Sequence, residues 1–226
     1  MTRIAILIAG LSGLAVIARA IAFYAGVDAI ALTVCIGMGV VLLLGTIELV
    51  RVATLTDALR SELSALPADA DVTVLERVSP ELRSLLHARL ERVALPVPTA
   101  MFTPYFVGLL VMLGLLGTFL GLFETLRGTH LVLGSSGDVD ALRQGLIQPM
   151  QGLMRSFGTS AAGVTGSAML GLASVFGRRS AAELTRSVHV LVAGALSSAS
   201  PAERQLAAIT QLAEQGRSLP DAAKAL

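Results

Sequence analysis

Hydrophobic positions along the chain gather into four long runs with almost no charge. A helix needs roughly 20 apolar residues to cross the hydrocarbon core of a membrane. The runs predict membrane spans at about 4–24, 29–47, 103–123 and 156–177. Arg19 interrupts the first run, and we expect its side chain to extend toward a membrane interface. The pattern predicts an all-α integral membrane protein with four transmembrane helices.

The first run also permits a different interpretation. Arg3, the apolar stretch after it and the small residues around Arg19 resemble the three regions of a cleavable signal peptide. An arginine at the cleavage position and further apolar residues up to Tyr24 favour an uncleaved span. Whether residues 1–20 are removed stays open, and three spans remain if they are.

Helical periodicity continues beyond the second and fourth spans. Leucine and valine residues repeat at three- and four-residue spacing as far as Pro67, and Ser79 followed by Pro80 is typical of a helix start. Residues 51–100 are therefore predicted to form a helical hairpin. The fourth span is expected to continue as a helix, and residues 200–203 form a capping box that opens another.

The segment between the third and fourth spans has its own helix signals. Asp138 and Asp140 are typical of a helix start. Pro149 lies before the fourth span, where it either kinks this helix or marks the first turn of a new one.

Arginine and lysine residues orient the spans, because short loops rich in them stay cytoplasmic. Residues 51–100 carry six of them, residues 178–226 carry six, and only Arg127, Arg143 and Arg155 lie between the third and fourth spans. The predicted segments are 1–50, transmembrane helices 1 and 2; 51–100, a cytoplasmic helical hairpin; 101–124, transmembrane helix 3; 125–155, a periplasmic loop and helix; 156–178, transmembrane helix 4; and 179–226, a cytoplasmic helical tail, whose truncation stays an open question.

Composition agrees with a membrane protein and argues against nucleic-acid binding, metal binding and catalysis. Hydrophobic residues make up 54% of the 226, charged residues only 15%, and the mean hydropathy is +0.76. A net charge of +1 argues against nucleic-acid binding. One cysteine and three scattered histidines supply no metal-ligand set. We expect no catalytic residues, no metal and no cofactor, and therefore no enzyme.

Small and hydroxyl-bearing residues form one stripe on each of the last two spans. On the third span, Thr118 accompanies three glycines at helical spacing; on the fourth, Thr159 lies beside a similar stripe. The glycines predict close helix packing, and the hydroxyls predict either packing or an ion path. The helix-packing candidates are Gly114, Gly117, Gly121, Gly163 and Gly171, and the ion-pathway candidates are Thr118, Thr159, Ser160 and Ser167.

The same two spans lack a titratable group. Asp, Glu, His and Lys are absent from residues 103–123 and 156–177, and Glu48 and Glu124 lie at the ends of their spans. A proton path normally needs such a group near the middle of the membrane. If the chain conducts protons, a partner has to supply the carboxylate.

Residues 114–122 (Gly-Leu-Leu-Gly-Thr-Phe-Leu-Gly-Leu) and 157–164 (Phe-Gly-Thr-Ser-Ala-Ala-Gly-Val) resemble the two pore-helix signatures of the MotA/TolQ/ExbB proton-channel family. Within it, the pattern is most similar to Zorya-type ZorA motor subunits. The resemblance covers about residues 101–180. Thr118 matches the pore threonine of the first signature, and either Thr159 or Ser160 fits the second.

This resemblance implies a stator or motor complex in the bacterial inner membrane. A homopentamer would surround the two helices of a MotB/ExbD-like, single-span partner dimer that supplies an intramembrane aspartate. Ion flow, of protons or sodium, would then drive rotation. The alternative that the residues leave open is a structural scaffold in the lipid bilayer, held together by the small-residue faces.

Overall fold

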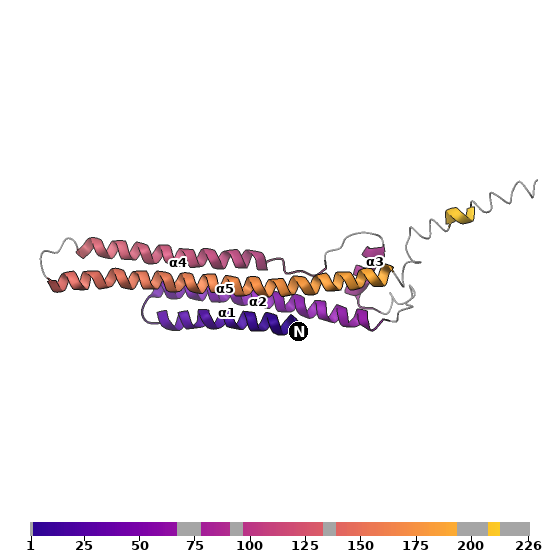
Figure 1. Cartoon of the computed structure of the whole chain (residues 1–226), viewed down its shortest axis with the longest axis horizontal. Coiled ribbons are helices and arrows are strands. Elements are labelled where there is room, and N and C mark those ends of the chain that lie inside the picture. The colour runs from indigo at the N-terminus through magenta and orange to yellow at the C-terminus, as the bar shows by residue number, and fades with distance from the viewer. Residues whose placement is uncertain (1, 67–77, 91–96, 133–138, 194–207, 213–226) are drawn as a thin grey trace, which may run out of the picture. The chain divides into compact units, whose positions relative to one another are not determined.

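The computed structural model describes residues 2–66, 78–90, 97–132, 139–193 and 208–212. Within these ranges the chain forms helices and no strand (Figure 1). A short helical segment at 208–212 follows five longer helices, which are α1 (Thr2–Tyr24), α2 (Ala29–Ser64), α3 (Pro80–Leu90), α4 (Thr103–Val132) and α5 (Val139–Ala193).

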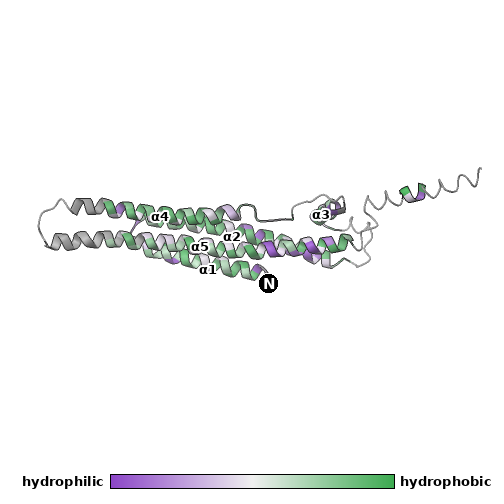
Figure 2. Cartoon of the chain, turned by 45° about the horizontal axis from the view of Figure 1, so that its top comes forward, coloured by the Kyte–Doolittle hydropathy of each residue, from purple (hydrophilic) through white to green (hydrophobic). Residues whose placement is uncertain are grey.

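Four of these helices are long and apolar enough to cross a membrane. They are α1, α2, the Thr103–Leu126 part of α4 and the Gly152–Ala193 part of α5. Figure 2 shows mainly hydrophobic residues along the described part of α4. The prediction of an all-helical protein with four helices able to span a membrane is confirmed for the described residues.

The chain divides into two compact units. The first contains Met1–Thr54 and Ala100–Arg179, and the second contains Leu55–Thr99 and Ser180–Leu226. The helices α2 and α5 each contribute residues to both.

A tight turn joins α1 to α2 in the first unit. Gly26 adopts a φ of 80°, in the left-handed region that a glycine reaches without strain. Asp28 then caps α2, because its Oδ1 accepts hydrogen bonds from the backbone N–H groups of Ile30 at 2.9 Å and Ala31 at 3.1 Å.

The core of the first unit lies where α1, α2, α4 and α5 meet. Gly10 of α1 lies against Thr46 of α2, and Gly45 of α2 lies against Leu170 of α5. Large side chains fill the spaces between these glycine contacts. The most deeply buried of them are Ile6, Ile17, Met38, Leu42, Leu49, Leu110 and Leu170.

A glutamate fixes the start of α4. The carboxylate of Glu48, on α2, accepts hydrogen bonds from the backbone N–H of Phe102 and the hydroxyl of Thr103, both at 2.8 Å. A negative charge also interacts favourably with the dipole at a helix N-terminus. Glu48 therefore ties α2 to the first turn of α4.

The second unit has an apolar core with charges outside. Ser79 caps α3 through a 3.4 Å contact from the N–H of Leu82, and its own hydroxyl donates to Glu62 at 2.6 Å. Arg60 and Glu183 form an exposed ion pair at 2.7 Å. The end of α2, the start of α3 and the end of α5 share an apolar cluster formed by Leu59, Leu63, Val78, Leu82, Leu86, Leu184 and Val188.

Two helices continue beyond the predicted spans. The third span is predicted to end near Phe123, and the helix α4 that contains it continues to Val132. No new helix begins at Pro149, because α5 runs through it as one helix from Val139; a proline removes one hydrogen bond from the ladder, and the flanking turns stay helical. Asp138 and the capping box at 200–203 lie outside the described residues.

Candidate functional site: the open face of the α4–α5 pair

Two glycines bring α4 and α5 together at backbone distance. A Cβ atom added to Gly163 would lie 2.8 Å from the Cα of Gly114 and 2.8 Å from the carbonyl oxygen of Leu110. These neighbours are backbone atoms, so they cannot rotate away. Only glycine fits at Gly163, which accounts for a small-residue stripe on each helix.

Two hydroxyl side chains of α5 occupy the space beside two further glycines of α4. Gly117 lies against Thr159, and Gly121 lies against Ser156. Each hydroxyl donates back to its own helix, Thr159 to the carbonyl of Ser156 at 3.0 Å and Ser156 to that of Gly152 at 2.9 Å. This part of the stripe is a packing contact, and both hydroxyl groups donate their hydrogen bonds within α5.

Gly171, by contrast, has open space where a side chain would begin. No atom lies within 4 Å of the position that its Cβ would occupy. Of the five predicted helix-packing glycines, the structure therefore places Gly114, Gly117, Gly121 and Gly163 between α4 and α5, and leaves Gly171 beside open space.

One flank of the α4–α5 pair is covered by α1 and α2. On α5, Gly158 lies against Tyr24, Gly166 against Ile17, and Leu170 against Gly45. On α4, Phe106 also reaches Gly45. These contacts identify the covered side.

The opposite flank carries the hydroxyls of Thr118 and Ser160. Gly117 faces Thr159 across the contact, and each following residue is rotated by about 100° around its helix. Because α4 and α5 are antiparallel (Figure 1), this step turns Thr118 and Ser160 to the same side of the pair, away from α1 and α2. We call this side the open face and define it by Leu115, Thr118, Leu122, Phe157, Ser160 and Val164.

Burial separates the four predicted ion-pathway residues into two pairs. Thr118 and Ser160 are half-buried on the open face, whereas Thr159 is 1% exposed and Ser167 is 6% exposed. Thr118 donates to the carbonyl of Leu115 at 2.6 Å, and Ser167 to that of Val164 at 2.8 Å. The structure thus groups Thr118 with Ser160 rather than with Thr159.

Large apolar side chains surround the two open-face hydroxyls. Leu115 is 59% exposed and Phe157 is 67% exposed, and Leu122 and Val164 are also exposed. A continuous apolar strip of this kind is typical of a surface in contact with lipid or with another membrane helix.

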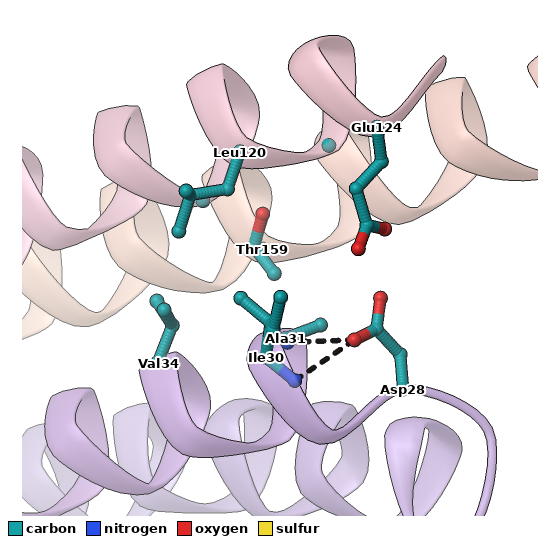
Figure 3. Close-up of a pocket in the computed structure, with 9 residues that line it drawn as sticks. Asp28, Ile30, Ala31, Val34, Leu120, Glu124 and Thr159 are labelled. Carbon is teal, nitrogen blue, oxygen red and sulfur yellow. Dashed lines mark hydrogen bonds between the residues drawn. The ribbon is translucent and has the colours of Figure 1, made fainter. Parts of the chain in front are cut away.

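Two carboxylates lie close together on the covered side. Asp28 and Glu124 line a cavity of about 10 Å³ together with Thr159, which is room for about one water molecule. Figure 3 shows the two carboxylates turned toward one another, while the hydroxyl of Thr159 points toward α4 and its methyl group toward α2. Asp28 was not singled out from the sequence, because nothing in the sequence shows that it lies near Glu124.

No known protein family, curated protein or solved structure matches the chain. The family resemblance therefore rests on residues 114–122 and 157–164 themselves. Their glycines form the α4–α5 contact, and their hydroxyls are divided between that contact and the open face.

Proposed function

We propose that this chain is the channel-forming subunit of an ion-driven membrane motor. The observation that carries the proposal is the pairing of Thr118 and Ser160 on the open face, on the side of the α4–α5 pair that α1 and α2 leave uncovered. Hydroxyl oxygens in an otherwise apolar strip can hydrate a passing cation or organise water.

In this proposal, five copies of the chain turn their open faces toward a central pair of partner helices. The partner dimer supplies the aspartate that binds the ion, because the open face carries no carboxylate among its six residues. Asp28 and Glu124 do not take this role, since they line the covered side of the α4–α5 pair. The open-face position of Ser160 favours it over Thr159 as the second pore hydroxyl.

Ion flux into proteoliposomes tests the proposal. The chain would be purified from its native membranes with any associated single-span protein, and its stoichiometry measured by native mass spectrometry. We expect five copies with two of the partner, and proton or sodium flux measured with dyes specific to each. The double variant T118V/S160A should reduce flux at least about tenfold without changing the subunit count.

Matched variants separate a pore role from a general loss of hydroxyls. Thr33→Val makes the same change on an exposed residue of α2, whose hydroxyl also donates to its own helix, at 2.7 Å. Flux should be retained in T33V. A monomer or dimer without partner, or equal flux in T118V/S160A and the unchanged protein, would refute the motor proposal.

The backbone contact between Gly114 and Gly163 favours a second candidate function, a membrane scaffold assembled through helix packing alone. A scaffold needs the glycines but not the hydroxyls. It predicts an assembly that persists in T118V/S160A, carries no ion flux, and needs no partner with an intramembrane aspartate.

A further inference from the structure

A groove on the first unit lies between α1 and α5. It has a volume of about 550 Å³. Its lining comes from two helices: Val16, Arg19, Ala20, Ala22, Phe23 and Tyr24 of α1, and Met154, Gly158, Ala161 and Ala162 of α5. This volume falls within the range of about 300–1,000 Å³ that is typical of small-molecule sites. The groove is built by small residues on α5, since Gly158, Ala161 and Ala162 leave the space that larger side chains would fill.

Almost all of the groove wall is apolar, and both helices are long enough to cross a membrane. An occupant therefore has to be an apolar chain that reaches the groove from within the membrane. The acyl chain of a lipid has this property, and the aromatic ring of Phe23 and the side chains of Val16 and Met154 offer it an apolar surface.

One charged residue, Arg19, stands among the described residues that line the groove. Its side chain is exposed, and within the described part of the chain it makes no hydrogen bond or ion pair. A guanidinium in a membrane span is costly unless an anion or water compensates it. Its planar donors match two phosphate oxygens at once.

We propose that the groove binds an anionic phospholipid, whose phosphate pairs with Arg19 and whose acyl chain lies between α1 and α5. A zwitterionic lipid fits less well, because the described lining offers no carboxylate to receive its ammonium group. The site is separate from the open face, so it does not depend on the motor proposal.

Native mass spectrometry of the delipidated full-length chain tests this site. Phosphatidylglycerol and phosphatidylethanolamine would be added in turn, and the retained lipid counted after detergent removal. We expect at least a fivefold preference for phosphatidylglycerol. Arg19→Gln should abolish the preference, and Ala161→Phe, which fills the groove from an exposed position, should reduce retention of both lipids.

Arg51→Gln serves as the matched control, because Arg51 is another exposed arginine of the first unit and does not line the groove. R51Q should retain the preference, and the thermal unfolding of each variant shows whether it is folded. Equal retention of the two lipids by the unchanged protein would overturn the proposal. So would an unaltered preference in R19Q, or a loss of subunit assembly in A161F with lipid retention unchanged, which would assign the groove to a second copy.

Discussion

In the first unit, α4 and α5 meet through glycines and hydroxyl residues and expose large apolar side chains, whereas in the second unit a cluster of leucines and valines is buried and the charged ion pair is exposed. Gly163 reaches the backbone of Gly114, while Phe157 is 67% exposed. Leu86 is fully buried, while Arg60 is exposed.

The difference follows from the solvent that each set of helices is built for. Apolar side chains gain nothing by leaving lipid for protein, so helices in a membrane associate through close backbone contact. In water, burial of apolar surface is the main driving force. The contrast favours lipid around the first unit and water around the second. The placement of residues 51–100 on the cytoplasmic side stays a prediction.

The largest effect should come from breaking the glycine contact. Gly163→Leu would place side-chain atoms where the backbone of Gly114 and Leu110 already lies, so we expect a loss of about 4 kcal/mol or more of stability. The measurement is the thermal unfolding temperature in detergent. Gly108→Leu is the control, because no atom lies within 4 Å of its Cβ position; equal shifts in the two variants would show that the contact is unimportant.

Truncating a core leucine of the second unit should have the next largest effect. Leu86 is fully buried in the cluster of the second unit, and its replacement by alanine should cost about 3 kcal/mol, because the cavity left behind is only partly refilled. Denaturant unfolding followed by circular dichroism measures this loss. Leu55→Ala, at a residue that is 52% exposed, should cost less than about 1 kcal/mol, and a similar cost for both would contradict a leucine core.

Removing the carboxylate of Glu48, which caps α4 in the first unit, should have an intermediate effect on stability. Glu48→Ala removes both hydrogen bonds that hold the start of α4, and we expect a loss of about 2 kcal/mol. Amide hydrogen exchange at the first turn of α4 should quicken. Glu48→Gln keeps an acceptor and should lose about half as much; if exchange at Phe102 is unaltered in E48A, the cap has no role.

The smallest effect should come from the exposed ion pair of the second unit. Arg60 and Glu183 are both at least half exposed, so the coupling energy between R60A and E183A should be below about 1 kcal/mol. A double-mutant cycle in denaturant measures this coupling. A value above about 2 kcal/mol would mean that a polar contact stabilises the second unit as strongly as the Glu48 cap is expected to stabilise the first.

The sequence predicts the helices better than it predicts the site. Apolar runs and caps such as Ser79 locate four membrane-long helices and the start of α3, because these depend on local composition and hydrogen bonding. The end of α4 at Val132 could not be read from the sequence, since the polar residues after Phe123 indicate the edge of a membrane and not the end of a helix.

The sequence could not show that Thr159 is buried in the helix contact while Ser160 lies on the open face. These residues are neighbours on α5, and only the positions of α1 and α4 around that helix decide which one is buried. The same holds for Asp28 and Glu124, which lie far apart in the chain and meet only after the helices assemble (Figure 3). The residues that line the groove at Arg19 likewise belong to two distant segments, α1 and α5.

The bond between Glu48 and the start of α4 has a consequence for biosynthesis. Phe102 follows Glu48 by 54 residues, and a ribosome that adds about 5–20 residues per second produces it roughly 3 to 11 seconds later. During this interval the carboxylate has no α4 to cap and has to stay hydrated at the membrane surface. If α4 is inserted after α2, hydration of this carboxylate would keep its end of α2 at the membrane surface until the first turn of α4 arrives.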